Sequence, residues 1–107
     1  MTHNPDDFPV WRPQERLLNR VMKPTDVKRK KKYLRNTADG FIKRKDVRDY
    51  IFKHKGTICY LCGAPATQID HKISVYRFAI EKLDIRDMNS FDNLFPICMI
   101  CNSSKLP

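Results

Sequence analysis

Apolar and polar residues alternate along this chain with a period that changes from one segment to the next. Between residues 42 and 55, Val47, Ile51 and His54 recur at the i, i+4, i+7 spacing of one helix face. Gly56 follows at the position where a helix end favours a left-handed residue. We therefore predict a helix over residues 42–55 that ends at Gly56.

Two shorter segments predict β-strands. In residues 67–73, alternation places Ile69 and His71 on one face and Asp70 on the other. Residues 94–97 form a second short apolar run. The other segments are predicted as a short helix at 14–22 between prolines, a basic helix at 27–35, a turn at 36–40, one or two helical turns at 75–83, a loop at 89–93 and a short helix at 98–105.

Four cysteines occur as two C-x-x-C pairs with 35 residues between them: Cys59, Cys62, Cys98 and Cys101. Each pair places two thiolates on one turn, and two pairs complete a tetrahedral zinc sphere. The N-terminal residues lack the basic and apolar segments of a secretory signal, which predicts a cytoplasmic protein and favours metal thiolates. Disulfides are the alternative. Structural zinc also suits a chain of 107 residues, because its core is small.

Positive charge is concentrated in the first half of the chain. The net charge is +9, and residues 1–50 carry 14 Lys and Arg against 7 Asp and Glu. Such a surface suits a polyanion, most simply DNA, although a solvated basic face is the alternative. No apolar run approaches the ~20 residues that span a membrane, so no membrane partner is expected. The predicted DNA-binding residues are Lys28, Arg29, Lys30, Lys31, Lys32, Arg35 and, near the C-terminus, Lys105.

An acid and a histidine stand side by side between the cysteine pairs, as Asp70 and His71. A purely structural zinc site needs neither. A carboxylate suits Mg²⁺ or Mn²⁺, and an imidazole can take a proton at neutral pH. In a helix that begins near Cys98, Asn102 and Lys105 share one face with the cysteines, so zinc would direct Asn102 at the second metal and Lys105 at a phosphate.

The segments CYLCGAPATQIDHKI and FDNLFPICMICNSSK resemble the HNH endonucleases, the ββα-metal nucleases. The resemblance implies that His71 is the general base, that Asp70 and Asn102 hold one divalent ion, and that Asn93 restrains the histidine through its backbone. The four cysteines would hold structural zinc. Asn102 stands where His is usual, which is a known variation within the family. The chain departs from the family pattern in two features: the final helix is expected to be only about two turns long, and VYRFAIEKLDIRD replaces a glycine-rich loop.

This resemblance implies a small α+β fold. A ββα-metal core, stapled by the four-cysteine zinc site, would occupy residues 42–107 and follow a basic, largely helical arm at 1–41. The expected function is a metal-dependent DNA endonuclease of phage or bacterial type that leaves 5′-phosphate and 3′-hydroxyl ends. The alternative is a non-catalytic zinc module that binds nucleic acid or protein. A homodimer and a phage or bacterial protein partner both stay open.

Overall fold

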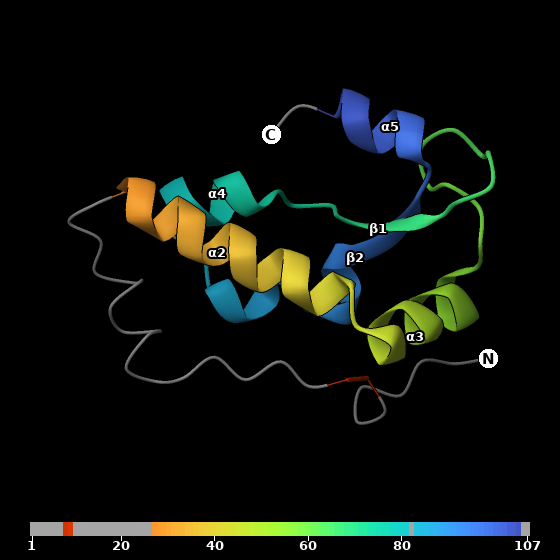
Figure 1. Ribbon diagram of the computed structural model, residues 1–107, viewed down its shortest axis with the longest axis horizontal. Helices are drawn as coiled ribbons and strands as arrows, with labels where there is room; N and C mark the ends of the chain where they lie inside the picture. The colour runs from red at the N-terminus through yellow and green to blue at the C-terminus, as the bar shows by residue number, and fades with distance from the viewer. Residues whose placement is uncertain (1–7, 10–26, 82, 106–107) are drawn as a thin grey trace.

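The computed structural model describes residues 8–9, 27–81 and 83–105 (Figure 1). Its elements are two long helices, a two-stranded sheet and several short helices. In chain order they are α2 (Val27–Ile42), α3 (Lys45–Lys55), β1 (Gln68–His71), α4 (Val75–Ile80), the 3₁₀ turns η2 (Ile85–Asp87) and η3 (Phe91–Asn93), β2 (Leu94–Ile97) and α5 (Met99–Ser104). The predicted small α+β class is confirmed. The predicted helix at 14–22 lies outside the described residues.

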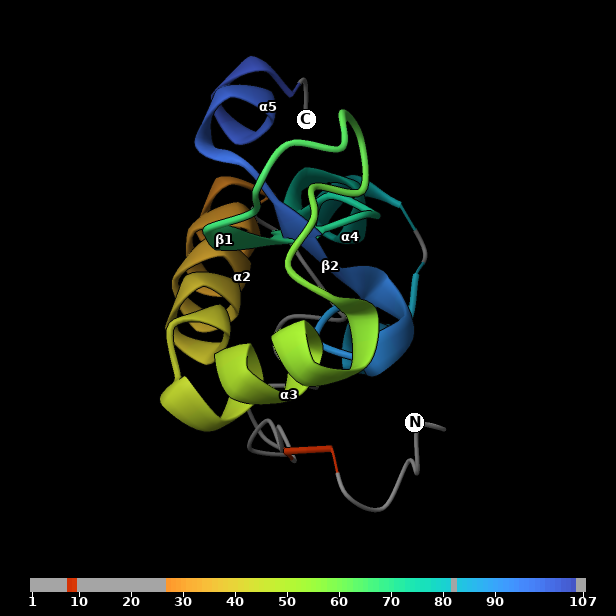
Figure 2. The same ribbon diagram turned by 90° about the vertical axis from the view of Figure 1, so that its right-hand side faces the viewer.

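The two strands pair antiparallel, with His71 opposite Leu94 and Gln68 opposite Ile97. β2 occupies the predicted residues 94–97, and β1 is shorter than the predicted strand at 67–73. Turned by 90°, the molecule has α5 at one end of the sheet and α3 at the other (Figure 2). The order β1, β2, α5 therefore places the second cysteine pair and the start of α5 directly after the strand that pairs with β1.

Helix α2 continues through the segment predicted as a turn, so that prediction, for residues 36–40, is wrong. Leu34, Ala38 and Phe41 recur at i, i+4, i+7 and are all buried. Within the helix, the Thr37 hydroxyl donates to the Tyr33 carbonyl at 2.9 Å. Burial of this apolar stripe outweighs the turn preference of the polar and glycine residues along the same segment.

Helix α3 begins at Lys45, three residues later than predicted, because Ile42 still belongs to α2. It ends as predicted at Gly56, whose φ of 85° lies in the left-handed region that glycine tolerates without strain. Lys55, in the last turn, donates from its ammonium to the carbonyls of Phe91 and Leu94. This single side chain therefore ties α3 to the turn that leads into β2.

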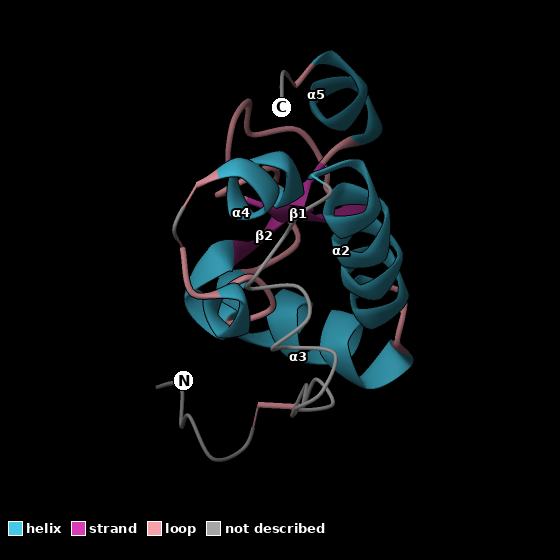
Figure 3. Ribbon diagram, turned by 90° about the vertical axis from the view of Figure 1, so that its left-hand side faces the viewer, coloured by secondary structure: helices cyan, strands magenta, loops and turns pink. Residues whose placement is uncertain are grey.

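Buried side chains form three adjoining clusters. The first joins α2 to α4 and includes Leu34, Ala38 and Phe78, and Figures 1 and 3 show these two helices side by side. The second joins α3 to the sheet, and the third surrounds the cysteines. The buried members of the first cluster are Leu34, Ala38, Val75, Phe78, Ala79, Ile85 and Met88. Those of the second are Phe41, Val47, Ile51, Ile69 and Leu94, and those of the third are Cys59, Ile97 and Cys98.

The division into an arm at 1–41 and a nuclease domain at 42–107 stays a prediction. The described part of the first segment packs closely on the second. Helix α2 shares the first cluster with α4, and the Phe8 ring lies edge-on to Tyr50 and Phe91 at 5.2 and 5.7 Å between ring centroids. Among the described residues, no helix is both long and apolar enough to cross a bilayer.

Candidate functional site

The first cysteine pair lies on a tight turn between α3 and β1. The Cys59 N–H donates to the Ala64 carbonyl at 2.7 Å, and the Gly63 N–H donates to the Cys59 carbonyl at 3.0 Å. Gly63 adopts a φ of 80°, which allows the chain to reverse directly after Cys62. The turn therefore presents two sulfur atoms toward the same side.

The second cysteine pair lies at the start of α5. Cys98 is the N-cap of this helix, and its sulfur accepts from the Cys101 N–H at 3.4 Å. The Asn102 N–H donates to the Cys98 carbonyl at 3.0 Å and so begins the helical bonding. The prediction that the second pair runs into a short helix is confirmed, with bounds Met99–Ser104 in place of 98–105.

The four sulfur atoms form a single cluster that can hold a metal ion. All of them lie within 4.8 Å of one another, and Cys62 Sγ lies 3.6 Å from Cys98 Sγ. A tetrahedral zinc with bonds of ~2.3 Å requires sulfur separations of roughly 3.8 Å. No disulfide links the four thiols. The donor set and its spacing thus fit structural zinc.

The electrostatics of the cluster favour a thiolate. Burial acts against ionisation of Cys59, but N–H groups of Cys98, Cys62 and Leu61 outweigh it and lower the pKa of this thiol to about 6. The Cys101 thiol donates toward the sulfurs of Cys62 and Cys98, which raises its pKa to about 12, so this thiol keeps its proton beside the charged neighbour. A metal ion replaces such shared protons when it binds.

A pocket of about 150 Å³ lies between β1, the start of α4 and α5. Three of the predicted site residues, Asp70, His71 and Asn102, line it together. Its full lining is Arg35, Asp70, His71, Ser74, Val75, Asn102 and Lys105. The structure therefore brings together residues that are up to 70 positions apart in the chain.

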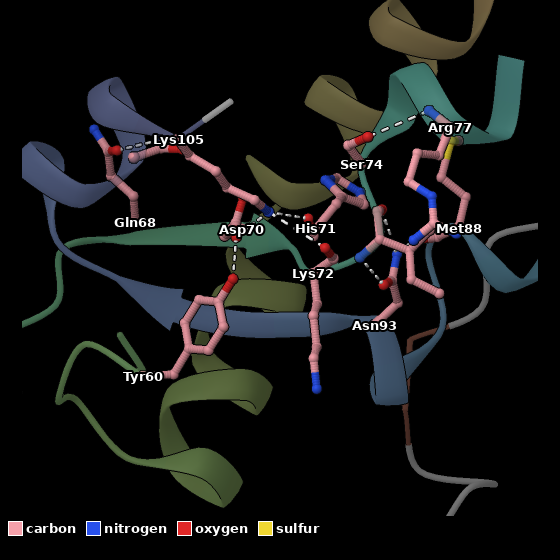
Figure 4. Close-up of polar contacts among 12 residues, drawn as sticks. Tyr60, Gln68, Asp70, His71, Lys72, Ser74, Arg77, Met88, Asn93 and Lys105 are labelled. Atoms are coloured by element: carbon pink, nitrogen blue, oxygen red, sulfur yellow. Dashed lines mark hydrogen bonds and ion pairs between the residues drawn. The ribbon is translucent and has the colours of Figure 1, made fainter. Parts of the chain in front are cut away.

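Asp70 is buried and receives two strong hydrogen bonds (Figure 4). The Tyr60 hydroxyl donates to its Oδ2 at 2.5 Å, and the Lys105 ammonium donates to the same oxygen at 2.6 Å. Within the described residues, Oδ1 of Asp70 has no hydrogen-bond partner. One carboxylate oxygen is thus held in place, and the other is available to a cation.

The Lys105 side chain contacts β1 at the edge of the pocket. Its ammonium donates to Asp70 and, at 2.6 Å, to the His71 carbonyl (Figure 4). The Lys105 ammonium, directly after α5, therefore links the end of that helix to β1. Its predicted contact with DNA stays a prediction.

His71 is 5% exposed, and its ring is fixed by a partner that the sequence did not indicate. Nε2 lies 2.9 Å from Oδ1 of Asn89, also buried. Because that oxygen only accepts, Nε2 carries the proton and Nδ1 keeps a lone pair. Burial lowers the pKa of His71 below its ordinary value, although the bond to Asn89 acts in the opposite direction. The ring is therefore neutral at pH 7, the form a general base requires.

Asn93 lies outside the pocket and binds the backbone that follows β1. Its Oδ1 accepts from the Ile73 N–H at 2.7 Å, and its Nδ2 donates to the carbonyls of Met88 at 2.9 Å and Ile73 at 3.2 Å. Its own carbonyl accepts from the Lys72 N–H at 2.8 Å. Asn93 thus fixes the backbone of Lys72 and Ile73, the two residues after His71. This geometry is compatible with the expected restraint of His71 through its backbone.

Asn102 is exposed on α5, and its Nδ2 donates to Oε1 of Gln68 at 2.6 Å. This bond orients the amide and leaves its Oδ1 as the atom suited to a metal. The side chains of Lys28 and Arg29 lie outside the described part of the chain. Lys31, Lys32 and Arg35 are exposed on α2, whereas Lys30 is half-buried.

Two side chains that bond to candidate site residues, Tyr60 and Asn89, escaped the sequence reasoning. Tyr60 lies between Cys59 and Cys62, and the cysteine turn brings its hydroxyl to Asp70 of β1. Its position within C-Y-L-C is the one sequence feature that could have indicated this contact, and it is a weak one. Burial and the bond to Asp70 raise the pKa of Tyr60, which therefore stays a donor at neutral pH. Asn89 lies 18 residues from His71, and no spacing rule connects the two.

Comparisons with family models, with curated proteins and with solved structures gave no match to this chain.

Proposed function

We propose that this chain is a metal-dependent DNA endonuclease of the ββα-metal, HNH type. The observation that carries the proposal is the shared pocket, in which a carboxylate, a neutral imidazole and an amide converge beside the four-cysteine cluster. The element order β1, β2, α5 agrees with a ββα core. A purely structural zinc module does not require these three side chains in one pocket.

In this mechanism Asp70 and Asn102 would hold one Mg²⁺ or Mn²⁺ through their Oδ1 atoms. Oxygen donors of this kind suit hard cations, and such an ion neutralises the phosphate and stabilises the leaving oxygen. Tyr60 and Lys105 orient Asp70 through its other oxygen. Zinc held by the four cysteines would take no part in the chemistry and would fix the start of α5.

His71 would act as the general base. Nδ1 takes a proton from water, the water oxygen bonds to phosphorus, and the bond from phosphorus to the 3′ oxygen breaks. The 3′ oxygen collects a proton from solvent, which leaves 5′-phosphate and 3′-hydroxyl ends. Asn89 holds the other ring nitrogen, so that only Nδ1 is available to the water.

The decisive experiment compares nicking of supercoiled plasmid by wild-type protein and by His71→Ala with Mg²⁺ or Mn²⁺. Loss of a general base lowers the cleavage rate by a factor of about 10²–10⁴. We expect a loss of that size with DNA affinity unchanged. His54→Gln, which changes the histidine on α3, is the control and should nick at the wild-type rate. A His71→Ala protein as active as wild type would refute the mechanism.

Variants of the metal ligands separate metal binding from proton transfer. Asp70→Ala and Asn102→Ala should raise the concentration of Mg²⁺ or Mn²⁺ needed for cleavage. Asn102→His should remain active with a shift toward softer ions, because imidazole can take the same coordination position. If none of the three changes alters the metal dependence, the proposed ligand set is wrong.

A second candidate is a non-catalytic zinc module that binds a protein or nucleic acid. It is favoured by exposed apolar side chains beside the cysteines, since Leu61, Met99 and Ile100 are 55%, 65% and 76% exposed. This alternative predicts that the protein binds DNA or another protein but does not nick plasmid, whichever divalent ion is added. The plasmid assay therefore distinguishes the two functions directly.

A further inference from the structure

A second hollow lies between α2 and α4, beside the candidate site. It has a volume of about 360 Å³, and its lining combines cationic, apolar and aromatic side chains. The residues are Lys31, Lys32, Arg35, Val75 and Tyr76. We call this hollow the α2–α4 groove. Its volume falls in the range of sites that bind small organic ligands, about 300–1,000 Å³.

The groove adjoins the pocket that holds Asp70 and His71. Arg35 and Val75 line both hollows, so no other element separates them. A nucleic-acid strand with its phosphate at the candidate site would therefore continue past Arg35 into the groove. The site and the groove together form one path along the surface.

The walls of the groove are held by the hydrophobic core. Leu34 and Ala38 of α2 pack with Phe78 and Ala79 of α4, and all four are buried. The Ser74 hydroxyl oxygen caps α4 by accepting from the Arg77 N–H at 3.2 Å. The spacing between the two helices is thus fixed before any ligand binds, which reduces the entropy lost on binding.

Positive charge in the groove is available to a ligand. Within the described residues, no carboxylate pairs with Lys31 or Lys32. Arg35 lies 3.7 Å from Asp39, and both side chains are largely exposed, so this ion pair is weak. Phosphate groups of a strand can therefore engage all three cations.

An aromatic ring forms part of the lining. Tyr76 is 37% exposed, and the Lys31 ammonium lies 4.6 Å from its ring centroid. A nucleobase inside a duplex has both faces covered by its neighbours, whereas an unpaired base exposes a face that stacks on an aromatic side chain. A groove that combines cations with an accessible ring is typical of sites for unpaired nucleotides.

We propose that the α2–α4 groove binds an unpaired nucleotide adjoining the scissile phosphate, with its base on Tyr76 and its phosphates on Lys31, Lys32 and Arg35. The stacked base displaces the Lys31 ammonium from the ring toward a phosphate. This inference rests on the proposed nuclease function and specifies its substrate class. The substrate is DNA with an unpaired segment at the point of cleavage, such as a flap, a branch or a single strand.

The test measures DNA binding by fluorescence anisotropy at fixed salt without added Mg²⁺ or Mn²⁺, so that no cleavage occurs while the cysteine site keeps its zinc. The probes are a labelled single strand, a flapped duplex and a blunt duplex of the same sequence. The variants are Tyr76→Ala, which removes the ring, and Tyr76→Phe, which keeps it. Ile80→Ala changes another exposed apolar residue of α4, outside the groove, and is the matched control. Circular dichroism confirms that each variant is folded.

Stacking of one base contributes about 1–3 kcal/mol, which corresponds to a factor of about 5–150 in affinity. We expect Tyr76→Ala to lose this factor for the single strand and the flap, and less than about twofold for the blunt duplex. Tyr76→Phe and Ile80→Ala should stay within about twofold of wild type on every probe.

Two outcomes would overturn the inference. In one, Tyr76→Ala binds all three probes as wild type does. In the other, it weakens all three equally, which would mean that the groove contacts duplex backbone alone. If wild type nicks plasmid in either case, the proposed nuclease function survives and the inference alone fails. A wild-type protein that binds none of the probes would contradict both.

Discussion

Asn93→Ala is the substitution whose effect on stability can be worked out most directly. The side chain is 5% exposed and makes three hydrogen bonds, one from the Ile73 N–H and two to the carbonyls of Ile73 and Met88. Alanine can make none of them. The substitution therefore leaves the backbone groups at the end of β1 without partners in a largely buried environment.

The magnitude follows from the number of bonds. A hydrogen bond contributes about 0.5–1.5 kcal/mol net, and a buried group left without a partner costs about 1–3 kcal/mol. For three bonds we expect the free energy of unfolding to fall by about 3 kcal/mol. With a urea m-value of about 1.5 kcal/mol per molar, the denaturation midpoint should fall by about 2 M.

The assay is urea denaturation followed by circular dichroism at one fixed zinc concentration, because bound metal itself adds to stability. Asn36→Ala is the matched control. That asparagine is exposed on α2, and alanine is the better helix former, so stability should stay equal or rise by a few tenths of a kcal/mol. Asn93→Asp keeps an acceptor for the Ile73 N–H but turns an oxygen toward two carbonyls, and it should be at least as destabilising as Asn93→Ala.

An Asn93→Ala protein within about 0.5 kcal/mol of wild type would refute this reasoning. It would mean that water replaces the amide or that residues 72–73 have another conformation. The Ile73 amide resonance in an NMR spectrum would locate the change, because its hydrogen-bond acceptor is the Asn93 side chain.

Four other outcomes are expected. Metal analysis should find about one zinc per chain, and a strong chelator should unfold the domain; a stripped protein with its full circular dichroism would contradict this. Burial lowers the pKa of Lys55 from 10.5 to about 8, so the folded state binds fewer protons than the unfolded chain in that pH window. The free energy of unfolding should therefore rise with pH there relative to Lys55→Met, and parallel curves would exclude the shift. Asn89→Ala should slow cleavage about 10²-fold without weakening DNA binding, since it frees the His71 ring; unchanged cleavage would remove Asn89 from the mechanism. Replacing Lys31 and Lys32 with Ala should reduce the slope of log Kd against log salt by about 2, and an unchanged slope would mean that these lysines stay solvated.

Features set by local pattern were predictable. The C-x-x-C spacing places sulfur atoms on turns whatever the remainder of the fold does, and the structure gathers all four. The end of α3 at Gly56 and the strand at 94–97 likewise depend on neighbouring residues. Where the local signal is strong and no distant contact opposes it, the sequence is sufficient.

Features set by distant contacts were not predictable. Helix α2 continues through a turn-like segment because Ala38 and Phe41 are buried against other elements. Asn89 reaches His71 from a separate loop, and Lys105 bonds Asp70 across 35 positions. A sequence lists the candidate polar residues, but the pairing among them is decided by how the helices pack on the sheet.

The position of the cysteine pairs has a consequence for chain entropy. Cys62 and Cys98 enclose 35 residues, and this segment contains Asp70, His71 and Asn93. A metal held by both pairs joins the ends of the segment as a covalent cross-link would, and for a loop of that length the removed chain entropy corresponds to about 4 kcal/mol. Metal occupancy would thereby limit the conformations of the pocket residues even in the unfolded chain. An insertion between α4 and η2 would lengthen this loop at little further entropic cost, because the closure term grows only with the logarithm of length.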